Sequence, residues 1–415
     1  MPLSRTKGVL RFDGIPVSTL GAFAGTPVYV YSWNRIADNV ASIAQHLRDT
    51  RHRIHYAVKA NSNHELLRRL ARLDIGFDVV SVGELERVLR IGGSPNSIMF
   101  SGVGKSLEEL AFAIKVGIGS INVESSGELS RIITLAKRLH VQANIMFRIN
   151  PCVDTATHPY LATALDSSKF GLSTDEVVEL AATVRDSDLV NVVGLSFHLG
   201  SQISEVVHFE VALSQLIECA EKIEHNGVPI DVFSLGGGFA TQYRDERSFS
   251  FSEFAKMVQD RLRHRTALIC IEPGRAIVAD AGILITRVEY LKRETGTGKK
   301  NFAIVDAGTN DLLRPVLYDS WHDIVVADDR EGTPGEWDIV GPICESSDVI
   351  GRDRMLTLSE GDLLVIQDVG AYGFSLSSNY NSRLRVAELL VSSEGIQLIK
   401  QRESLVDLVR LEDPT

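Results

Sequence analysis

The chain has 415 residues, of which 44% are hydrophobic and 23% are charged, and this composition is typical of a globular protein. Its length predicts two domains rather than one. The formal net charge of −11 and the lack of a basic cluster argue against nucleic acid as a partner. The four cysteines are scattered without metal-ligand spacing, so we expect no metal site.

The first residues, "MPLSRTKGVLRFDG", lack the apolar core of a signal peptide. No apolar run in the sequence is long enough to cross a bilayer, so we expect no membrane partner. Few and dispersed cysteines are typical of proteins from a reducing compartment. We therefore expect a cytoplasmic protein.

Strand-like and helix-like segments alternate from about residue 27 to residue 276. Amphipathic patterns such as "HELLRRLARL" and "SLEELAFAIKVG" separate most of the strand candidates. Strands that alternate with helices imply a parallel sheet, and eight such units in about 250 residues favour a (β/α)8 barrel over a doubly wound sheet. The eight strand candidates are "RIHYAVK", "GFDVVS", "SIMFSG", "SINVES", "NIMFRINP", "VGLSFHLGS", "VFSLGGG" and "LICIEPGR".

The pattern changes after residue 280. Short β-rich segments separated by Gly, Asp or Pro turns are typical of an antiparallel β domain. They are "AGILITRVEYLKRE", "KNFAIVDAG", "EWDIVGPIC", "DLLVIQDVG" and "VAELLVSSEGIQLIK", and the N-terminal strand "GVLRFDGIPV" is expected to join them. We predict a barrel at residues 28–278 and a β-sandwich or β-barrel domain formed by residues 1–27 and 279–415.

Charged, polar and glycine residues recur at the carboxyl ends of the predicted barrel strands, whose interiors are apolar. Each alone has a structural explanation, because a lysine can reach water, a histidine can be a satisfied core residue and glycines can form a turn. Barrel enzymes carry their active sites at this end, so the convergence predicts a site. The residues are Lys59, Asp78, Ser81, Glu124, Arg148, His198, Ser201, the glycines 236–238 and residues 272–275.

The residue types at these strand ends indicate an aldehyde cofactor that carries a phosphate. Lys59 ends the apolar strand of "HYAVKAN", where an amine can form a Schiff base. The glycines of "LGGGFA" can present backbone N–H groups to a phosphate. The carboxylate of "EPGR" can keep a pyridine nitrogen protonated. Together these features predict pyridoxal 5′-phosphate (PLP).

The sequence resembles the PLP-dependent decarboxylases that have an alanine-racemase-like barrel (fold type III), and among them the diaminopimelate decarboxylases. Motifs similar to the wider group are "YAVKAN", "FDVVSVGEL", "FRINP", "HLGSQI", "LGGG" and "EPGR". Motifs similar to the diaminopimelate decarboxylases are "THPYLATALDSSKFG", "TNDLLRPVLY", "GPICESSD" and "DVGAYGFSLSSNYNSR". The resemblance covers nearly the whole chain and implies PLP-dependent decarboxylation of meso-2,6-diaminopimelate to L-lysine and CO2.

The resemblance also implies roles for individual residues. Lys59 is implied to carry PLP, and Cys344 to donate a proton. His198 is implied to stack on the cofactor ring, and Glu272 to pair with the ring nitrogen. Further implied cofactor-binding residues are Asp78, Arg148, Ser201, Gly237, Gly238, Gly274, Arg275 and Tyr372. The implied substrate-binding residues are Arg275, Arg314, Tyr318, Glu345 and Tyr372.

In the family, Cys344 and Glu345 reach the site from the partner subunit, which implies a homodimer with shared active sites. One alternative is a decarboxylase of ornithine, lysine or a D-amino acid on the same scaffold. Arg275, Arg314 and Glu345 favour a substrate that is charged at both ends, because guanidinium groups bind carboxylates and a carboxylate binds an ammonium group. The other alternative is a relative that only binds PLP, but such a protein is expected to lack Lys59, Cys344 or Glu272.

Overall fold

The computed structural model describes residues 2–153, 168–293 and 300–412. Most of the motif at 157–171 therefore lies outside the described residues. The chain folds into two compact units, here called the barrel unit and the β unit. The barrel unit consists of Val40–Thr241 and Arg247–Ala276, and the β unit consists of Met1–Asn39, Gln242–Glu246 and Ile277–Thr415.

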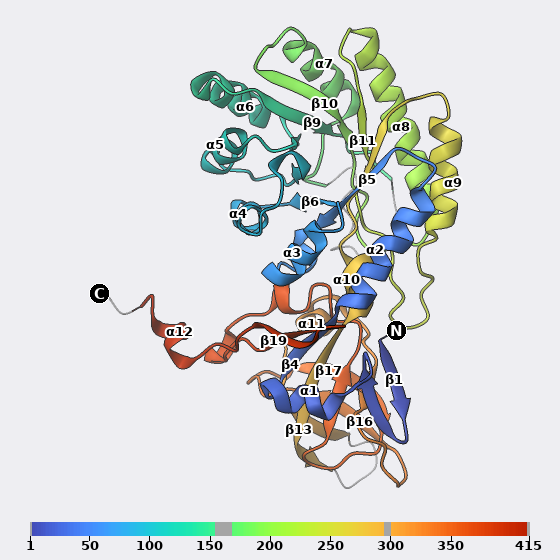
Figure 1. Cartoon of the computed structure of the whole chain (residues 1–415), viewed down its shortest axis with the longest axis vertical. Coiled ribbons are helices and arrows are strands. Elements are labelled where there is room, and N and C mark those ends of the chain that lie inside the picture. The colour runs from blue at the N-terminus through green and yellow to red at the C-terminus, as the bar shows by residue number, and fades with distance from the viewer. Residues whose placement is uncertain (1, 154–167, 294–299, 413–415) are drawn as a thin grey trace. The chain divides into compact units, whose positions relative to one another are not determined.

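The barrel unit contains a closed barrel of eight parallel strands, in the spatial order β10-β11-β12-β5-β6-β7-β8-β9 (Figure 1). Each of the eight predicted strands is present, so the prediction of a (β/α)8 barrel is confirmed. The strands are β5 (His52–Ala57), β6 (Gly76–Val79), β7 (Ile98–Phe100), β8 (Ser120–Val123), β9 (Ala143–Arg148), β10 (Val190–Ser196), β11 (Val232–Ser234) and β12 (Leu268–Ile271).

Helices connect the barrel strands, and most of them begin at a serine. Serine hydroxyls at the N-caps of five helices accept hydrogen bonds from the backbone N–H of a glutamate three residues later, which satisfies an otherwise unpaired donor of the first turn. The connecting helices are α3 (His64–Ala71), α4 (Val82–Arg90), α5 (Leu107–Val116), α6 (Ser126–Leu139), α7 (Thr174–Val184), α8 (Val206–His225) and α9 (Phe251–Leu262), with 3-10 turns at Val58–Ala60 and Pro95–Ser97, and α2 (Trp33–Leu47) precedes β5.

The middle of the barrel interior is apolar. Met99, Met146 and Cys270, from three different strands, form a buried cluster there. Side chains of successive strand residues point to opposite faces, so the residues two positions further along these strands face the interior above the cluster. This apolar layer closes the barrel below the carboxyl ends of its strands.

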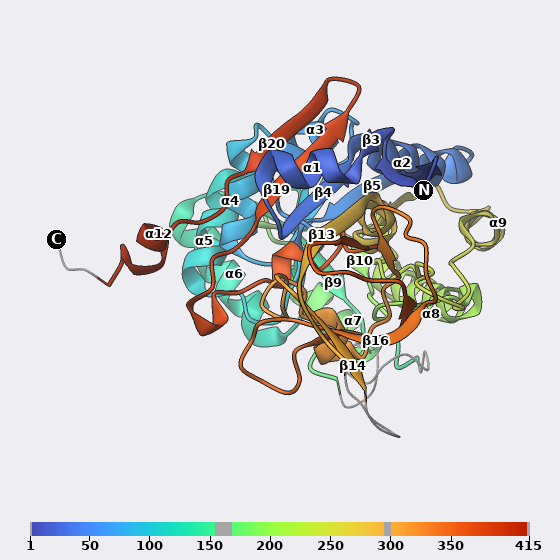
Figure 2. The same cartoon turned by 90° about the horizontal axis from the view of Figure 1, so that it is seen from below.

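The β unit contains a nine-stranded sheet in the order β17-β16-β14-β13-β4-β19-β20, and β18 pairs with β13 and β15 (Figure 2). Most strand pairs of this sheet are antiparallel, as predicted, whereas β14 pairs with β16 and β4 with β19 in parallel. The strands are β4 (Val28–Ser32), β13 (Gly282–Lys292), β14 (Asn301–Val305), β15 (Ile324–Val326), β16 (Gly335–Val340), β17 (Val349–Leu356), β18 (Leu363–Ile366), β19 (Ala387–Ser392) and β20 (Gly395–Lys400).

The N-terminal strands form a small sheet of their own within the β unit rather than a strand of the large sheet. This sheet consists of β1 (Leu3–Thr6), β2 (Val9–Phe12) and β3 (Ile15–Pro16). It joins the rest of the unit through a bridge between Val9 and Asp328 and through a shared apolar core. The remaining helices are α1 (Val17–Ala24), α10 (Arg275–Val278), α11 (Arg314–Tyr318) and α12 (Leu405–Val409), with 3-10 turns at Ala279–Ala281, Phe374–Leu376 and Tyr380–Ser382.

The observed units differ from the expected division at the N-terminal boundary. The expected barrel began at residue 28, whereas residues 28–39 belong to the β unit. The reason is β4, in which all five residues are buried and which pairs with β13 and β19. A strand buried on both faces reads as a continuous apolar run, which also describes a strand of a parallel barrel.

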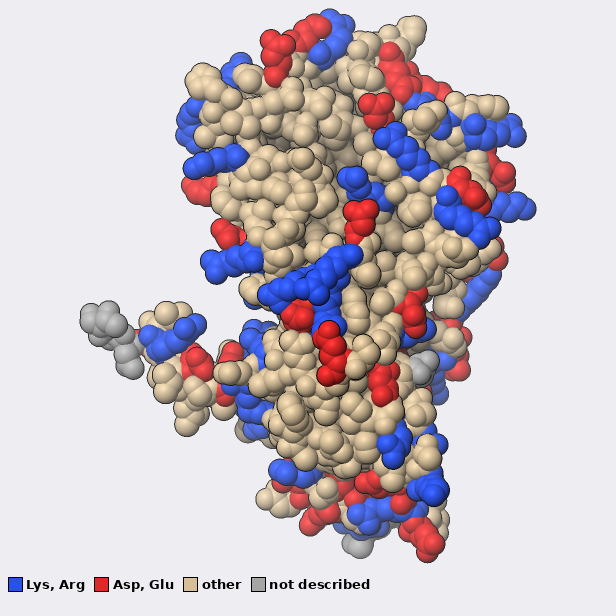
Figure 3. Space-filling model, viewed as in Figure 1, with Lys and Arg blue, Asp and Glu red and all other residues tan. Residues whose placement is uncertain are grey.

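The surface gives further information on the expected partners. Figure 3 shows Lys and Arg side chains interspersed with Asp and Glu side chains over its visible face. No helix among the described residues has the length and apolar character needed to span a membrane. Within the same residues no cluster of His, Cys, Asp or Glu side chains is arranged to hold a metal ion.

Candidate active site

Lys59 lies just after the end of β5, in the 3-10 turn formed by residues 58–60. Its side chain is 37% exposed, and its Nζ lies 3.7 Å from Oδ2 of the fully buried Asp78 on β6. The other carboxylate oxygen of Asp78 accepts a hydrogen bond of 2.6 Å from Ser101 Oγ, which in turn accepts one of 2.9 Å from Asn122 Nδ2. Three neighbouring strand ends therefore fix the carboxylate that faces the lysine amine.

Glu272 follows β12 and is buried with its carboxylate in the barrel interior. Burial raises the pKa of Glu272 to about 7, and the nearby charge of Asp78 adds to this effect. Ser234 Oγ donates a hydrogen bond of 2.6 Å to Glu272 Oε1 and opposes the shift, as do the charges of Lys59 and Arg148. This carboxyl group can therefore hold or release a proton near neutral pH.

His198 follows β10 and lies beside the glycine turn after β11. Burial and the positive charges of Lys59 and Arg148 lower the pKa of His198 well below its ordinary value, so the ring is neutral. The backbone N–H of Gly237 donates to His198 Nδ1 at 3.1 Å, which places the ring proton on Nε2. A backbone hydrogen bond with Gly200 also holds the ring, which is neutral and presents a flat face without charge.

The turn formed by residues 236–238 leaves no room for side chains. A Cβ atom on Gly237 would lie 2.2 Å from the carbonyl oxygen of Glu272, and one on Gly238 would lie 2.1 Å from that of Gly200. Gly238 also has a positive φ of 88°, which favours glycine. The backbones of these strand ends therefore approach one another closely, as a phosphate-binding turn requires.

The turn at residues 272–275 packs against the lysine-bearing strand end. A Cβ atom on Gly274 would lie 2.9 Å from the Cβ of Ala60, so this position also requires glycine. Arg275 is buried, and its Nη2 donates to Ser201 Oγ at 3.0 Å. This contact joins the loop after β10 to the loop after β12.

Arg148 ends β9 and is buried beside Glu124, which follows β8. The Nη1 atom of Arg148 donates to Glu124 Oε1 at 2.8 Å, and its guanidinium lies 4.7 Å from the centre of the Phe170 ring. Ion pairing within a protein satisfies both charges and fixes the direction of the arginine side chain.

Several of these residues line a common cavity of about 120 Å³ at the carboxyl ends of the barrel strands. The predicted residues that it brings together are Lys59, Arg148, His198 and Glu272. Ser201, Gly237, Gly238, Gly274 and Arg275 lie on the adjoining turns, and Asp78 faces Lys59.

The remaining predicted residues belong to the β unit. Arg314 and Tyr318 are the first and last residues of α11. Arg314 is buried, its Nη1 lies 2.9 Å from His322 Nε2, and its guanidinium lies 4.5 Å from the centre of the Tyr243 ring. A helix brings residues four positions apart onto one side, so the arginine and Tyr318 lie close together.

Cys344 and Glu345 lie on the loop between β16 and β17 and are both exposed. The backbone N–H of Cys344 donates to Asn381 Oδ1 at 3.0 Å. The Glu345 carboxylate accepts hydrogen bonds from Tyr380 and from Ser347, which lower its pKa. This loop presents a charged carboxylate and a thiol at the surface of the β unit.

Tyr372 lies on the loop after β18 and has a φ of +56°, which non-glycine residues rarely adopt. Backbone strain of this kind persists where the surrounding structure imposes it and often accompanies function.

Sequence reasoning missed four polar residues of this site: Ser101, Asn122, Ser196 and Ser234. Each is buried on or next to an otherwise apolar barrel strand. A polar residue inside such a strand is the signal that would have identified them, since buried polar groups are generally hydrogen-bonded. Phe170, which contacts Arg148, carried no comparable signal.

The barrel and its site match a known family. Residues 33–279 match the family model described as pyridoxal-dependent decarboxylase, pyridoxal binding domain. A diaminopimelate decarboxylase of Vibrio cholerae is 46% identical over 98% of this chain and 97% of its own length. A diaminopimelate decarboxylase of Pseudomonas aeruginosa is 44% identical over 95% of both chains. The chain therefore belongs to the pyridoxal-dependent decarboxylases, in the family of the diaminopimelate decarboxylases.

Solved structures agree with this placement over the whole fold. The chain superposes with a TM-score of 0.91 on a diaminopimelate decarboxylase from Helicobacter pylori complexed with L-lysine, at 40% identity, covering 95% of this chain and 98% of the other. The TM-score is 0.93 for the enzyme from M. jannaschii in complex with L-lysine, at 33% identity, covering 100% and 98%.

Proposed function

We propose that the chain decarboxylates meso-2,6-diaminopimelate to L-lysine and CO2, with PLP bound at the carboxyl end of the barrel. The observation that carries this proposal is the near full-length similarity to diaminopimelate decarboxylases, at 46% and 44% identity. Similarity over whole chains covers the barrel and the β unit together, so it supports a shared substrate as well as a shared fold. A cytoplasmic location is part of the same proposal.

The residues at the barrel mouth fit PLP in their chemistry. The closely packed glycine turn at residues 236–238 suits a phosphate, because no side chain comes between the ligand and the backbone N–H groups. Lys59 offers an amine for the aldehyde, and Glu272 offers a carboxyl group for the ring nitrogen. When bound, PLP would accept the electron pair that remains after CO2 leaves.

The protein's own groups would orient the cofactor and control protons. Asp78, fixed by Ser101, keeps the Lys59 amine directed into the cavity. The neutral His198 ring would stack on the flat cofactor without placing a second charge beside it. Because the pKa of Glu272 is raised to about 7, this carboxyl group can share a proton with a basic ring nitrogen.

The β unit would recognise the distal end of the substrate and supply a proton. A guanidinium such as that of Arg314 suits a carboxylate, and the charged Glu345 suits an ammonium group. A thiol is a competent proton donor, and Cys344 would protonate the carbon that has lost CO2. We propose that Cys344 and Glu345 act in the site of a partner subunit, which makes the active form a homodimer.

Substrate comparison tests the reaction. The purified protein is incubated with PLP and with meso-diaminopimelate, ornithine, L-lysine or a D-amino acid, and CO2 release is measured. We expect kcat/KM to be highest for meso-diaminopimelate. The other substrates lack the pair of an amine and a carboxylate at the distal end and therefore leave charged groups in the site unpaired. Faster turnover of ornithine or lysine would assign the chain to the alternative decarboxylase.

Mixing two inactive variants tests the shared site. Lys59→Ala lacks the amine of the barrel site, whereas Cys344→Ala lacks the thiol of the loop. If each site combines Lys59 of one subunit with Cys344 of the other, mixed dimers contain one intact site. Exchange of subunits should then restore roughly a quarter of the wild-type activity, since half of the dimers are mixed. Activity that stays at the level of the separate variants would contradict the shared site.

A further inference from the structure

The Glu124 carboxylate, which follows β8, accepts hydrogen bonds from three other segments of the barrel unit. Its side chain is 2% exposed. Its Oε1 atom accepts hydrogen bonds from Arg148 Nη1 at 2.8 Å and from the backbone N–H of Gly102 at 3.2 Å. Its Oε2 atom accepts one from the backbone N–H of Gly171 at 3.0 Å. One carboxylate thus joins the loop after β7, the end of β9 and the segment that leads into α7.

A second buried ion pair holds Glu124 itself in place. The backbone N–H of Glu124 donates to Glu128 Oε2 at 2.8 Å. The other oxygen of Glu128 lies 2.8 Å from Lys105 Nζ, and the side chain of Lys105 is 1% exposed. Lys105 also donates to the carbonyl oxygens of Gly102 and Asn122. Glu124 is therefore anchored through its backbone, and its carboxylate has little freedom to move.

This arrangement constrains the side chain of Arg148. It lines the same cavity as Glu272 and Lys59, and its charge acts on both Glu272 and His198. A buried guanidinium that loses its partner is expected to pair with another carboxylate, because an unpaired buried charge is costly in free energy. Glu272, after β12, lines this cavity, and Asp78 on β6 faces Lys59, which also lines it. Without Glu124, Arg148 would turn toward them.

We propose that Glu124 is a positioning residue: it holds Arg148 against the wall of the barrel mouth and so keeps the Glu272 carboxylate available for the ring nitrogen of the cofactor. This inference rests on the proposed binding of PLP. It gives a role in the site to a buried ion pair that otherwise looks purely structural.

The test compares Glu124→Gln with Asp338→Asn, a matched control that removes the charge of a buried, ion-paired carboxylate of the β unit without touching Arg148 or Glu124. PLP affinity is measured by titration of the apoprotein, and the absorbance of the bound cofactor is followed against pH. We expect Glu124→Gln to weaken PLP binding about tenfold or more and to shift the pH midpoint of the absorbance, because Arg148 then competes for Glu272. Asp338→Asn should lower the urea midpoint of unfolding and leave PLP affinity within about twofold.

A double variant separates positioning from simple loss of fold. If Glu124 acts through Arg148, Glu124→Gln combined with Arg148→Met should bind PLP no more weakly than Arg148→Met alone. Glu124→Asp, which keeps the charge, should recover most of the affinity. Additive losses in the double variant, or a Glu124→Gln protein with wild-type affinity and pH midpoint, would overturn the proposal. A wild-type protein that binds no PLP would instead refute the proposed function.

Discussion

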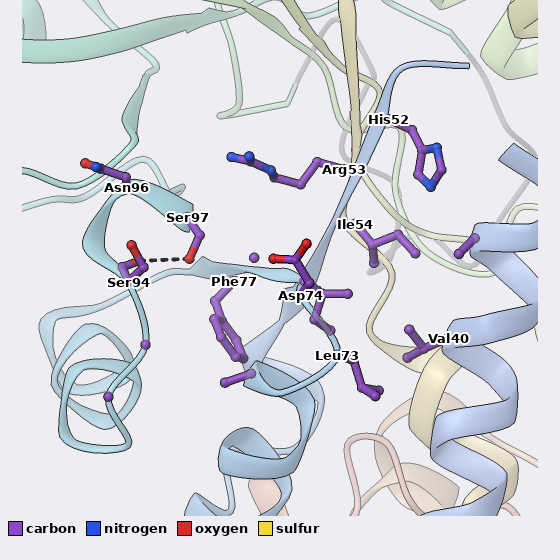
Figure 4. Close-up of a pocket in the computed structure, with 16 residues that line it drawn as sticks. Val40, His52, Arg53, Ile54, Leu73, Asp74, Phe77, Ser94, Asn96 and Ser97 are labelled. Carbon is purple, nitrogen blue, oxygen red and sulfur yellow. Dashed lines mark hydrogen bonds between the residues drawn. The ribbon is translucent and has the colours of Figure 1, made fainter. Parts of the chain in front are cut away.

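The two ends of the barrel differ in whether their charged side chains are paired with one another. At the carboxyl end, Lys59 faces Asp78 and Arg148 is paired with Glu124 around a cavity of about 120 Å³. At the amino end, a larger cavity of about 630 Å³ lies among the starts of β5, β6 and β7 (Figure 4). Its charged residues include Arg53 and Asp74, and neither forms a hydrogen bond or an ion pair with any described residue.

This difference shows that cavity size alone does not identify a site. The amino-end cavity arises because β6 pairs with β5 only from His55 onward, so residues 52–54 extend beyond the start of β6. The smaller cavity contains polar groups from several strands whose pKa values shift because they are buried together, as in catalytic sites. These observations favour the carboxyl end as the place of the chemistry, and the amino end is expected to contribute to stability alone.

The largest effect should come from Lys59→Ala at the carboxyl end. Loss of the amine removes the proposed attachment point of PLP, so CO2 release should fall by roughly a thousandfold or more. The absorbance of the Schiff base between Lys59 and the cofactor should disappear as well, which a diode-array spectrum of the purified protein measures. A variant that keeps its spectrum and a tenth of its activity would remove the distinction between the two ends.

Gly237→Ala should come next. The new Cβ atom would lie 2.2 Å from a backbone oxygen of Glu272, so the turn must shift, and we expect a loss of about 2 kcal/mol or more in the free energy of unfolding. PLP occupancy should fall with it. The matched control is Gly92→Ala at the amino end, where φ is +84° but no atom lies within 4 Å. It should cost about 1 kcal/mol from the backbone alone and leave occupancy unchanged.

His55 lies on β5 between the two ends and makes stability depend on pH. Burial, together with the charge of Arg53, lowers the pKa of His55 from 6.5 to about 3. Above pH 6.5 the ring is neutral in both states and contributes nothing. Below it, the unfolded chain binds a proton that the folded chain does not, so stability should fall by about 1.4 kcal/mol per pH unit. Urea unfolding at pH 7, 6 and 5 measures this slope, and His55→Gln should lower it by that amount; an unchanged slope would contradict the assignment.

The smallest effect should come from Arg53→Met and Asp74→Asn in the amino-end cavity. Neither side chain forms a hydrogen bond or an ion pair with a described residue, so each substitution should change the free energy of unfolding at pH 7 by less than about 0.5 kcal/mol. The kcat/KM value should stay within roughly twofold of the wild type. A tenfold loss of activity in either variant would show that the amino end takes part in function.

The barrel could be predicted from the sequence because each strand is a short apolar run with a polar residue after it. The β unit was harder. β15 has only three residues, and β17 carries exposed charged residues that do not resemble a strand. The parallel pairing of β4 with β19 joins residues more than 350 positions apart, which no local pattern indicates.

The sequence could nominate the residues at the strand ends as candidates for a site, but it could not predict the hydrogen bonds that fix them. Lys59, His198 and Glu272 are recognisable because they end apolar strands. The hydrogen bonds that fix them come from Ser101, Asn122 and Ser234, whose short polar side chains are common on strands and turns of every kind. Their importance depends on which strands are neighbours in the closed barrel, and that order comes from tertiary structure.

The order of the strands along the chain has a consequence for synthesis. β4 emerges from the ribosome before the entire barrel, yet its partner β13 follows about 250 residues later. At 5–20 residues per second, this apolar strand waits roughly 12 to 50 seconds without its native neighbours. The barrel unit therefore has time to fold first, while β4, with the sequence "VYVYS", stays open to wrong pairing. Chaperones that bind short apolar segments of nascent chains would be able to bind β4 during this time.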